Sequence, residues 1–221
     1  MDMNAATHEA GHATVLCSVM LKTSTGWVCG SDTLKEITII PEGNNLGHVR
    51  RWCGSEIECT PEILAYLLAG AIAERRFGGS ITGNSGDVEQ IAKLLGHNVS
   101  DYRSVPASIR VIVDALQSAE STDEAIRLMP AGNALTAVSD PSFKLLAESA
   151  DLARLILTTH WHVVLQLATG LLKHRRFFLI DYYMRKVGVR PVAWDAKSIR
   201  RRAQARARRA KARAKAKGAT A

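Results

Sequence analysis

The hexapeptide Thr7-His8-Glu9-Ala10-Gly11-His12 is the most informative stretch of this chain. Histidines four positions apart share one face of an α-helix, about 40° apart around its axis and about 6 Å apart along it. Both imidazoles can therefore bind one metal ion. The glutamate between them is turned to the flank, where it can hydrogen-bond a water held on zinc. The pattern predicts a zinc site with Glu9 as general base; the alternative is a short helix with two surface histidines.

A hydrolytic zinc site needs a third protein ligand and an open fourth position. The ten residues after His12 contain no histidine or carboxylate, which argues against a third ligand close by in the sequence. The carboxylates that follow are Asp32, Glu36, Glu42, Glu56, Glu58, Glu62, Glu74, Asp87 and Glu89. Spacing alone does not choose among them.

Three further motifs follow the histidine pair. In order, the chain carries His-Glu-Ala-Gly-His-Ala at 8–13, Ile-Thr-Ile-Ile-Pro at 37–41 with Leu-Gly at 46–47, Ala-Gly-Ala-Ile-Ala-Glu at 69–74 with Phe-Gly-Gly at 77–79, and Thr-Gly-Asn-Ser-Gly-Asp at 82–87. Together they resemble the peptidase domain of FtsH-type proteases (peptidase family M41), which are membrane-anchored, ATP-dependent zinc enzymes. The resemblance covers residues 5–96 well and residues 141–186 loosely.

The resemblance implies that Asp87 is the third zinc ligand, because the family's Thr-Gly segment ends in the ligand aspartate. An aspartate at the start of a helix more commonly caps it, so capping is the alternative role. Asn84 and Gly86 differ from the family segment, and Glu89 is kept as the alternative ligand.

Glu74 is a conspicuous charge near the end of a predicted apolar helix. A buried carboxylate beside zinc-bound histidines usually orients an imidazole through its second nitrogen. We therefore predict this role for Glu74, with pairing to Arg75 or Arg76 as the alternative. Gly11 costs helix stability; it either leaves room for another helix to pack closely under the metal or is indifferent.

The sequence predicts a mainly α fold with a small β element, the FtsH-like helical zinc metallopeptidase domain. The predicted helices, each with periodic apolar residues or a capping pattern, cover residues 3–20, 61–77 with Thr60 as the cap and Pro61 at the first position, 87 or 88 to 95, 108–119, a stretch opened by 121–124, and a long helical pattern from 140 through 172. Residues 24–34 are predicted as a loop, and residues 36–40 as a strand with a hairpin partner at 47–50.

Charge divides the chain into a domain, residues 1–190, and a basic C-terminal tail, residues 191–221, which we expect to be disordered alone. Residues 197–217 hold eleven Lys and Arg and no acid, which accounts for the net charge of +8. The rest of the chain has 18 basic against 21 acidic residues. We expect residues 197–217 to bind nucleic acid or acidic partners, with a solubilising role as the alternative.

The sequence contains no predicted membrane segment. The longest apolar stretch, residues 63–73, is eleven residues long and too short to span a bilayer. The first residues lack the positive charge and apolar core of a secretion signal. Cys17, Cys29, Cys53 and Cys59 form no Cys-x-x-Cys pair, so we expect reduced thiols and a cytoplasmic protein.

These features predict a zinc-dependent metalloendopeptidase that hydrolyses unfolded or partner-delivered proteins. We expect a peptide substrate to extend the edge of the strand at 36–40, and His48 to be an exposed loop residue, with a place in the cleft as the alternative. The sequence has no Gly-x-x-x-x-Gly-Lys-Ser/Thr phosphate loop. We therefore expect no ATPase activity of its own, and a separate ATPase or a homo-oligomeric ring as partner. The alternative function is a non-catalytic zinc-fold adaptor that acts through its basic tail.

Overall fold

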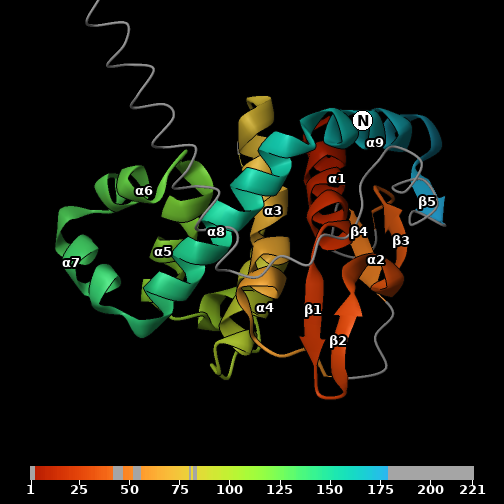
Figure 1. Ribbon diagram of the computed structural model, residues 1–221. Helices are drawn as coiled ribbons and strands as arrows, with labels where there is room; N and C mark the ends of the chain where they lie inside the picture. The colour runs from red at the N-terminus through yellow and green to blue at the C-terminus, as the bar shows by residue number, and fades with distance from the viewer. Residues whose placement is uncertain (1–2, 42–46, 52–55, 80, 82–83, 179–221) are drawn as a thin grey trace, which may run out of the picture.

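The computed structural model describes residues 3–41, 47–51, 56–79, 81 and 84–178 (Figure 1). This part of the chain is mainly helical with small sheets, as predicted. The helices are α1 (Met3–Cys17), α2 (Gly30–Thr33), α3 (Pro61–Phe77), α4 (Ser85–Leu94), the 3₁₀ turn η1 (Tyr102–Ser104), α5 (Ala107–Ser118), α6 (Thr122–Leu128), α7 (Ala131–Ser139), α8 (Pro141–Thr159) and α9 (Trp161–His174). The strands are β1 (Met20–Thr23), β2 (Gly26–Cys29), β3 (Leu34–Thr38), β4 (His48–Arg51) and β5 (Arg176–Phe178).

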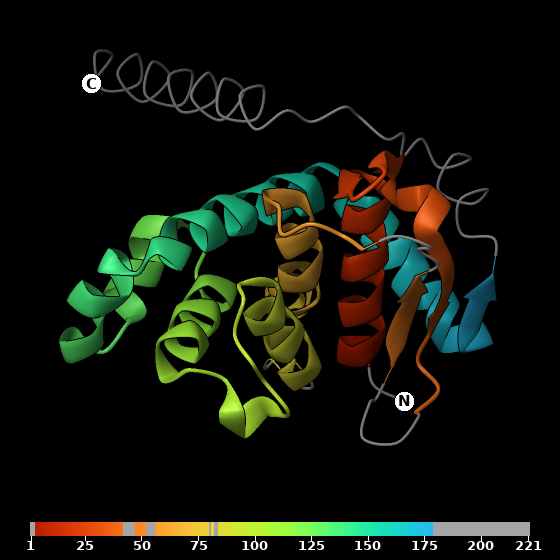
Figure 2. The same ribbon diagram turned by 90° about the horizontal axis from the view of Figure 1, so that it is seen from below.

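The first helix, α1, lies at the centre of the molecule. It packs against α3 and α9, and α3 packs in turn against α8 (Figures 1 and 2). Every residue of α1 from Ala6 to Cys17 is buried, including both histidines of the zinc motif. A helix that is buried all round belongs to the core of a protein. The alternative of two surface histidines is therefore wrong.

The contact between α1 and α3 depends on Gly11. A Cβ atom at this position would lie 2.6 Å from the Cβ atom of Ala73 and 2.8 Å from the carbonyl oxygen of Ala69, both in α3. Real Cβ atoms do not approach other atoms this closely, so any larger residue would push the two helices apart. Gly11 allows the close packing that was one of its two predicted roles.

A three-stranded antiparallel sheet covers α1 on the side opposite α5, in the order β4-β3-β5 (Figure 1). In β3, Ile37 pairs with Val49 of β4 on one side and with Phe177 of β5 on the other. The predicted hairpin is confirmed, whereas β5, which comes from the far end of the domain, is not predicted by the sequence. Both β3 and β4 pack against α1, which places β4 beside the zinc motif.

The first helix is shorter than the sequence predicts. The apolar spacing favours a helix through Met20, but α1 ends at Cys17 and β1 begins at Met20. Residues 24–34, predicted as a loop, contain β2 and α2. In β1 the alternating residues Leu21 and Thr23 are buried, as in a strand with one face on the core. Pairing of β1 with β2 therefore overrides the helical spacing.

The predicted helical stretch from 140 through 172 is confirmed, and in the structure it consists of two helices. α8 and α9 meet at His160, whose φ of −114° and ψ of 25° are not helical, and the pair is bent by 79°. The bend allows α8 to pack on α3 and α9 to pack on α1. No single helix in the described part of the chain is long and apolar enough to cross a membrane, although α8 and α9 pass that test as a bent pair.

Some predictions fall outside the described residues. They include the domain boundary at residue 190, the basic segment 197–217 and Cys53. Three of the four cysteines lie within the described residues, where they form no disulfide; they are Cys17, Cys29 and Cys59.

Candidate metal centre

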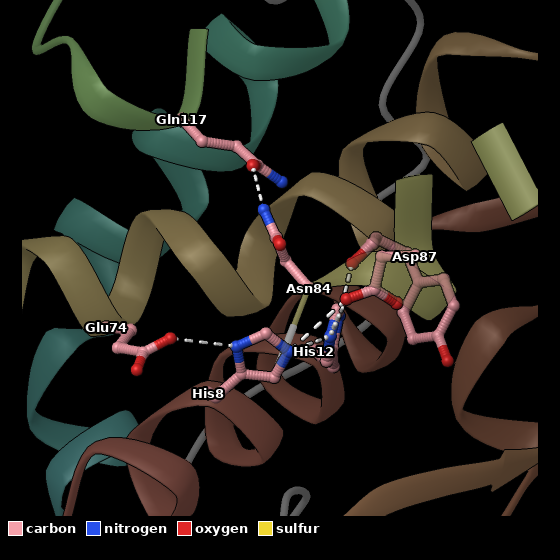
Figure 3. Close-up of polar contacts among 7 residues, drawn as sticks. His8, His12, Glu74, Asn84, Asp87 and Gln117 are labelled. Carbon is pink, nitrogen blue, oxygen red and sulfur yellow. Dashed lines mark hydrogen bonds and ion pairs between the residues drawn. The ribbon is translucent and has the colours of Figure 1, made fainter. Parts of the chain in front are cut away.

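His8, His12 and Asp87 meet at one point inside the protein (Figure 3). The Nε2 atoms of the two histidines are 3.0 Å apart. Oδ2 of Asp87 lies 3.2 Å from Nε2 of His8 and 3.1 Å from Nε2 of His12. The histidines come from α1 and the aspartate from α4, more than seventy residues later in the chain. One nitrogen from each imidazole and one carboxylate oxygen therefore form a nearly equilateral triangle of potential ligand atoms.

The other ring nitrogens of the two histidines are also bonded. Nδ1 of His12 donates to the backbone carbonyl of Tyr66 at 2.7 Å, and Nδ1 of His8 lies 3.3 Å from Oε2 of Glu74. Both acceptors belong to α3, and the Glu74 side chain is completely buried. An imidazole whose Nδ1 donates a proton has its lone pair on Nε2. These contacts therefore aim the metal-binding nitrogens of both histidines at Asp87.

Gly70 makes room for the two imidazoles. It lies on α3 between Tyr66 and Glu74, and a Cβ atom there would be 2.4 Å from Nε2 of His12 and 2.6 Å from Nε2 of His8. No other residue fits this position while the rings keep their places. Gly70 belongs to the motif at residues 69–74, but the sequence did not predict a role for it.

Asp87 is the third residue of α4, and Asn84 occupies the N-cap position. The helix thus begins two residues earlier than the sequence predicts, and Asp87 is not its N-cap. Among the described residues, Glu89 is not part of the group whose ligand atoms lie within 4.8 Å of one another. Two residues apart on a helix, Asp87 and Glu89 point to different faces, which explains why only one of them reaches the histidines.

Glu9 is buried beside the ligand triangle, where 6% of its surface is exposed. Burial raises the pKa of the Glu9 carboxyl to about 7, against the smaller opposing effect of His8 and His12. A carboxyl group with a pKa near the working pH is suited to accept and return protons.

The electrostatics of the centre favour a positive charge. Burial opposes protonation of His8, but hydrogen bonds to Asp87 and Glu74 outweigh burial and raise its pKa to about 10. Burial likewise opposes ionisation of Asp87, yet the charges and hydrogen bonds of His12 and His8 hold the pKa of its carboxyl well below the usual range. With Glu9, three carboxyl groups surround two imidazoles. This arrangement suits a divalent cation bound by neutral histidines.

A cavity of about 130 Å³ adjoins the metal centre. The three ligand residues and Glu9 line it, together with His48 and Val49 of β4 and Tyr66 of α3. The prediction that His48 is an exposed loop residue is therefore wrong. His48 opens β4 opposite Thr38, and pairing of the strands brings its side chain into the cleft. The cavity thus lies between β4 and the ligand triangle.

The sequence of the chain was compared with known proteins. The model of peptidase family M41 matches residues 2–177. Among curated proteins, no sequence matches the chain. The matched range contains α1, α3 and α4, and therefore every residue of the candidate metal centre.

Proposed function

Because the chain belongs to peptidase family M41, we propose that it is a zinc-dependent metalloendopeptidase acting on unfolded or partner-delivered polypeptides. The observation that carries this proposal is the convergence of His8, His12 and Asp87 on one point, with the Glu9 carboxyl beside it. Two imidazoles and one carboxylate are a ligand set found in catalytic zinc sites, which keep one position open for water or substrate.

The donor atoms fit a zinc ion. Tetrahedral ligands about 2.0–2.1 Å from zinc lie about 3.3 Å from one another, and the three donor atoms here are 3.0, 3.1 and 3.2 Å apart. An outward shift of a few tenths of an ångström would match the ion. His8, His12 and Asp87 would hold zinc, and the ion would supply Lewis acidity to the scissile carbonyl and to the attacking water.

The residues of the chain divide the remaining work. Glu9 accepts a proton from the attacking water and then passes it to the leaving amine. Because water itself is the nucleophile, no covalent enzyme intermediate is needed. Glu74 and the Tyr66 carbonyl hold Nδ1 of His8 and of His12 in the protonated form, which keeps both Nε2 lone pairs free for the metal. We propose Glu74 as the carboxylate that orients His8.

The prediction that a peptide extends the edge of the strand at 36–40 is wrong, because β3 is paired on both sides, with β4 and with β5. We propose instead that the substrate binds as an added strand on β4. β4 is at the end of the sheet order β4-β3-β5, and its residues His48 and Val49 line the cavity at the metal centre. An extended peptide can add to a strand edge through main-chain hydrogen bonds, largely independent of its sequence. This mode of binding favours unfolded chains. We further propose a separate ATPase or a homo-oligomeric ring as the means of delivery, and the cytoplasm as the compartment.

Hydrolysis of an unfolded, casein-like protein in the absence of ATP tests this function. We expect cleavage by the zinc-loaded protein, loss of cleavage after zinc is removed with a chelator, and recovery when zinc is restored. Cleavage that survives complete zinc removal would contradict the proposal. A folded, zinc-loaded protein that cuts neither casein nor small peptides would favour the adaptor function instead.

A further inference from the structure

Gln117 belongs to α5, a helix that contributes no ligand to the metal centre, yet its side chain reaches the start of α4. Its Oε1 atom accepts a hydrogen bond from Nδ2 of Asn84 at 2.8 Å. Figure 3 shows this contact next to the ligand triangle, with Asn84 between Gln117 and Asp87. The bond therefore connects α5 with the helix that carries the third ligand.

Asn84 uses its side chain in an unusual way for its position. An asparagine at an N-cap usually accepts a hydrogen bond from an amide of the first helical turn, but Asn84 makes no side-chain capping bond. The backbone carbonyl oxygen of Asn84 accepts a hydrogen bond from the backbone amide of Val88 at 3.1 Å, so the backbone of Asn84 takes part in the first helical turn. The side chain is left to tie the helix start to Gln117.

The side-chain amide of Gln117 is buried, which lowers the stability of the fold. The residue is 1% exposed, and its Nε2 atom has no hydrogen-bond partner among the described residues. A buried amide destabilises a fold unless its polar atoms are bonded. An apolar residue of similar length would suit this core position better for stability alone. The bond to Asn84 is thus the contribution that distinguishes glutamine here.

The buried side chains of α4 lie beyond its first residues. The buried residues of α4 are Val88, Ile91 and Ala92, all of which follow Asp87. Asp87 itself must stay within a fraction of an ångström of its place to complete the ligand triangle. A bond that fixes the residue three positions before it restrains that part of the helix.

We propose that Gln117 is a positioning residue, which holds Asp87 in place for the metal through its hydrogen bond to Asn84. This inference rests on the proposed zinc site. The inference adds Gln117 of α5 to the residues that position the metal ligands. It also assigns a role to Asn84, one of the positions at which the chain differs from the family segment. Gln117 touches neither metal nor substrate and acts only on the geometry of the ligand.

The test uses Gln117→Met, which keeps the length of the side chain and removes its polar atoms. Zinc affinity is measured by competition with a chromophoric chelator, and thermal unfolding is measured on the zinc-free protein. Loss of one neutral hydrogen bond should weaken zinc binding about threefold to tenfold. Stability without zinc should stay equal or rise, because an unbonded buried atom is removed. A purely structural residue would instead lower stability and leave zinc affinity unchanged.

Asn84→Ala provides a second route to the same bond and remains available if Gln117→Met does not fold. It should weaken zinc binding to a similar extent, and the double variant should be no weaker than either single one. Ser149→Ala is the control, because it removes a buried side-chain hydrogen bond within α8 and should leave zinc affinity unchanged.

Zinc affinity equal to wild type in Gln117→Met, or losses that add in the double variant, would overturn the inference while the zinc site stands. A wild-type protein that binds no zinc would overturn the proposed function and this inference with it. The two failures are therefore distinguished by the wild-type measurement alone.

Discussion

The Nδ1 atom of His8 lies 3.3 Å from Oε2 of Glu74, across the contact between α1 and α3. The Glu74 side chain is completely buried, and a buried carboxylate destabilises a fold unless it is paired or hydrogen-bonded, as Glu74 is with His8. The alternative of surface pairing with Arg75 or Arg76 does not suit a side chain in this position, because both arginines are exposed. The contact instead connects the charge to the metal centre.

Glu74→Gln should weaken zinc binding between about 10-fold and 100-fold, as is usual when the partner of a ligand histidine is changed. The amide can still accept a hydrogen bond from His8 but no longer carries the charge that makes the imidazole more basic. Glu62→Gln is the control, since Glu62 is also a buried carboxylate of α3 and lies twelve residues earlier. If both variants bind zinc as the wild type does, Glu74 does not orient His8.

Asp87→Ala should lower zinc affinity by an order of magnitude or more and abolish hydrolysis, because two histidines alone hold zinc weakly. Bound zinc is measured after dialysis. Glu89→Ala is the matched control on the same helix and should keep both metal and activity. The reverse result, with metal kept in Asp87→Ala and lost in Glu89→Ala, would transfer the ligand role to Glu89.

Gly70→Ala should remove the zinc site by steric overlap. The new Cβ atom would lie 2.4 Å from Nε2 of His12, and relief of the overlap should cost about 1–3 kcal/mol of stability as well as zinc binding. Gly86→Ala is the control, because Gly86 lines the cavity at the metal centre but a Cβ atom there meets nothing within 4 Å. Equal zinc content in the two variants would show that the rings have room to move.

Removal of the chain after Asp195 takes away eleven positive charges and no acid. Hydrolysis of a small peptide should change little, whereas binding to nucleic acid should fall sharply. For the full-length protein, affinity for duplex DNA should decrease by about 0.9 decade per decade of salt for each phosphate contacted. DNA binding that is unchanged by the truncation, or that is insensitive to salt, would locate the interaction elsewhere on the protein.

The sequence predicted the parts of the site that are local. Helical geometry alone pairs His8 with His12, and the turn chemistry around Thr60 predicts the start of α3 at Pro61. Asp87 comes from a separate helix, so only the order of the motifs pointed to it. No local signal predicts the bond between Gln117 and Asn84, which are 33 positions apart, because such contacts are set by how the helices pack.

The features of the fold that the sequence did not predict have the same origin. β1 follows α1 where apolar spacing still favours a helix, because β2 offers a partner strand. The break at His160 carries no proline or glycine, and it is the packing of α8 on α3 and of α9 on α1 that requires the bend. His48 was predicted to be an exposed loop residue, but the pairing of β4 with β3 brings it into the cleft. In each case long-range packing outweighs a local preference.

Glu9 is proposed to serve as the general base of a zinc peptidase, and the substitution Glu9→Gln tests this role. Zinc content and the initial rate of hydrolysis of a small fluorogenic peptide are measured on the same samples of wild type and variant. The amide cannot accept the water's proton, so we expect equal zinc and a rate lower by about 10²–10⁴-fold. A variant that holds equal zinc and cleaves within a few-fold of the wild-type rate would contradict this role for Glu9.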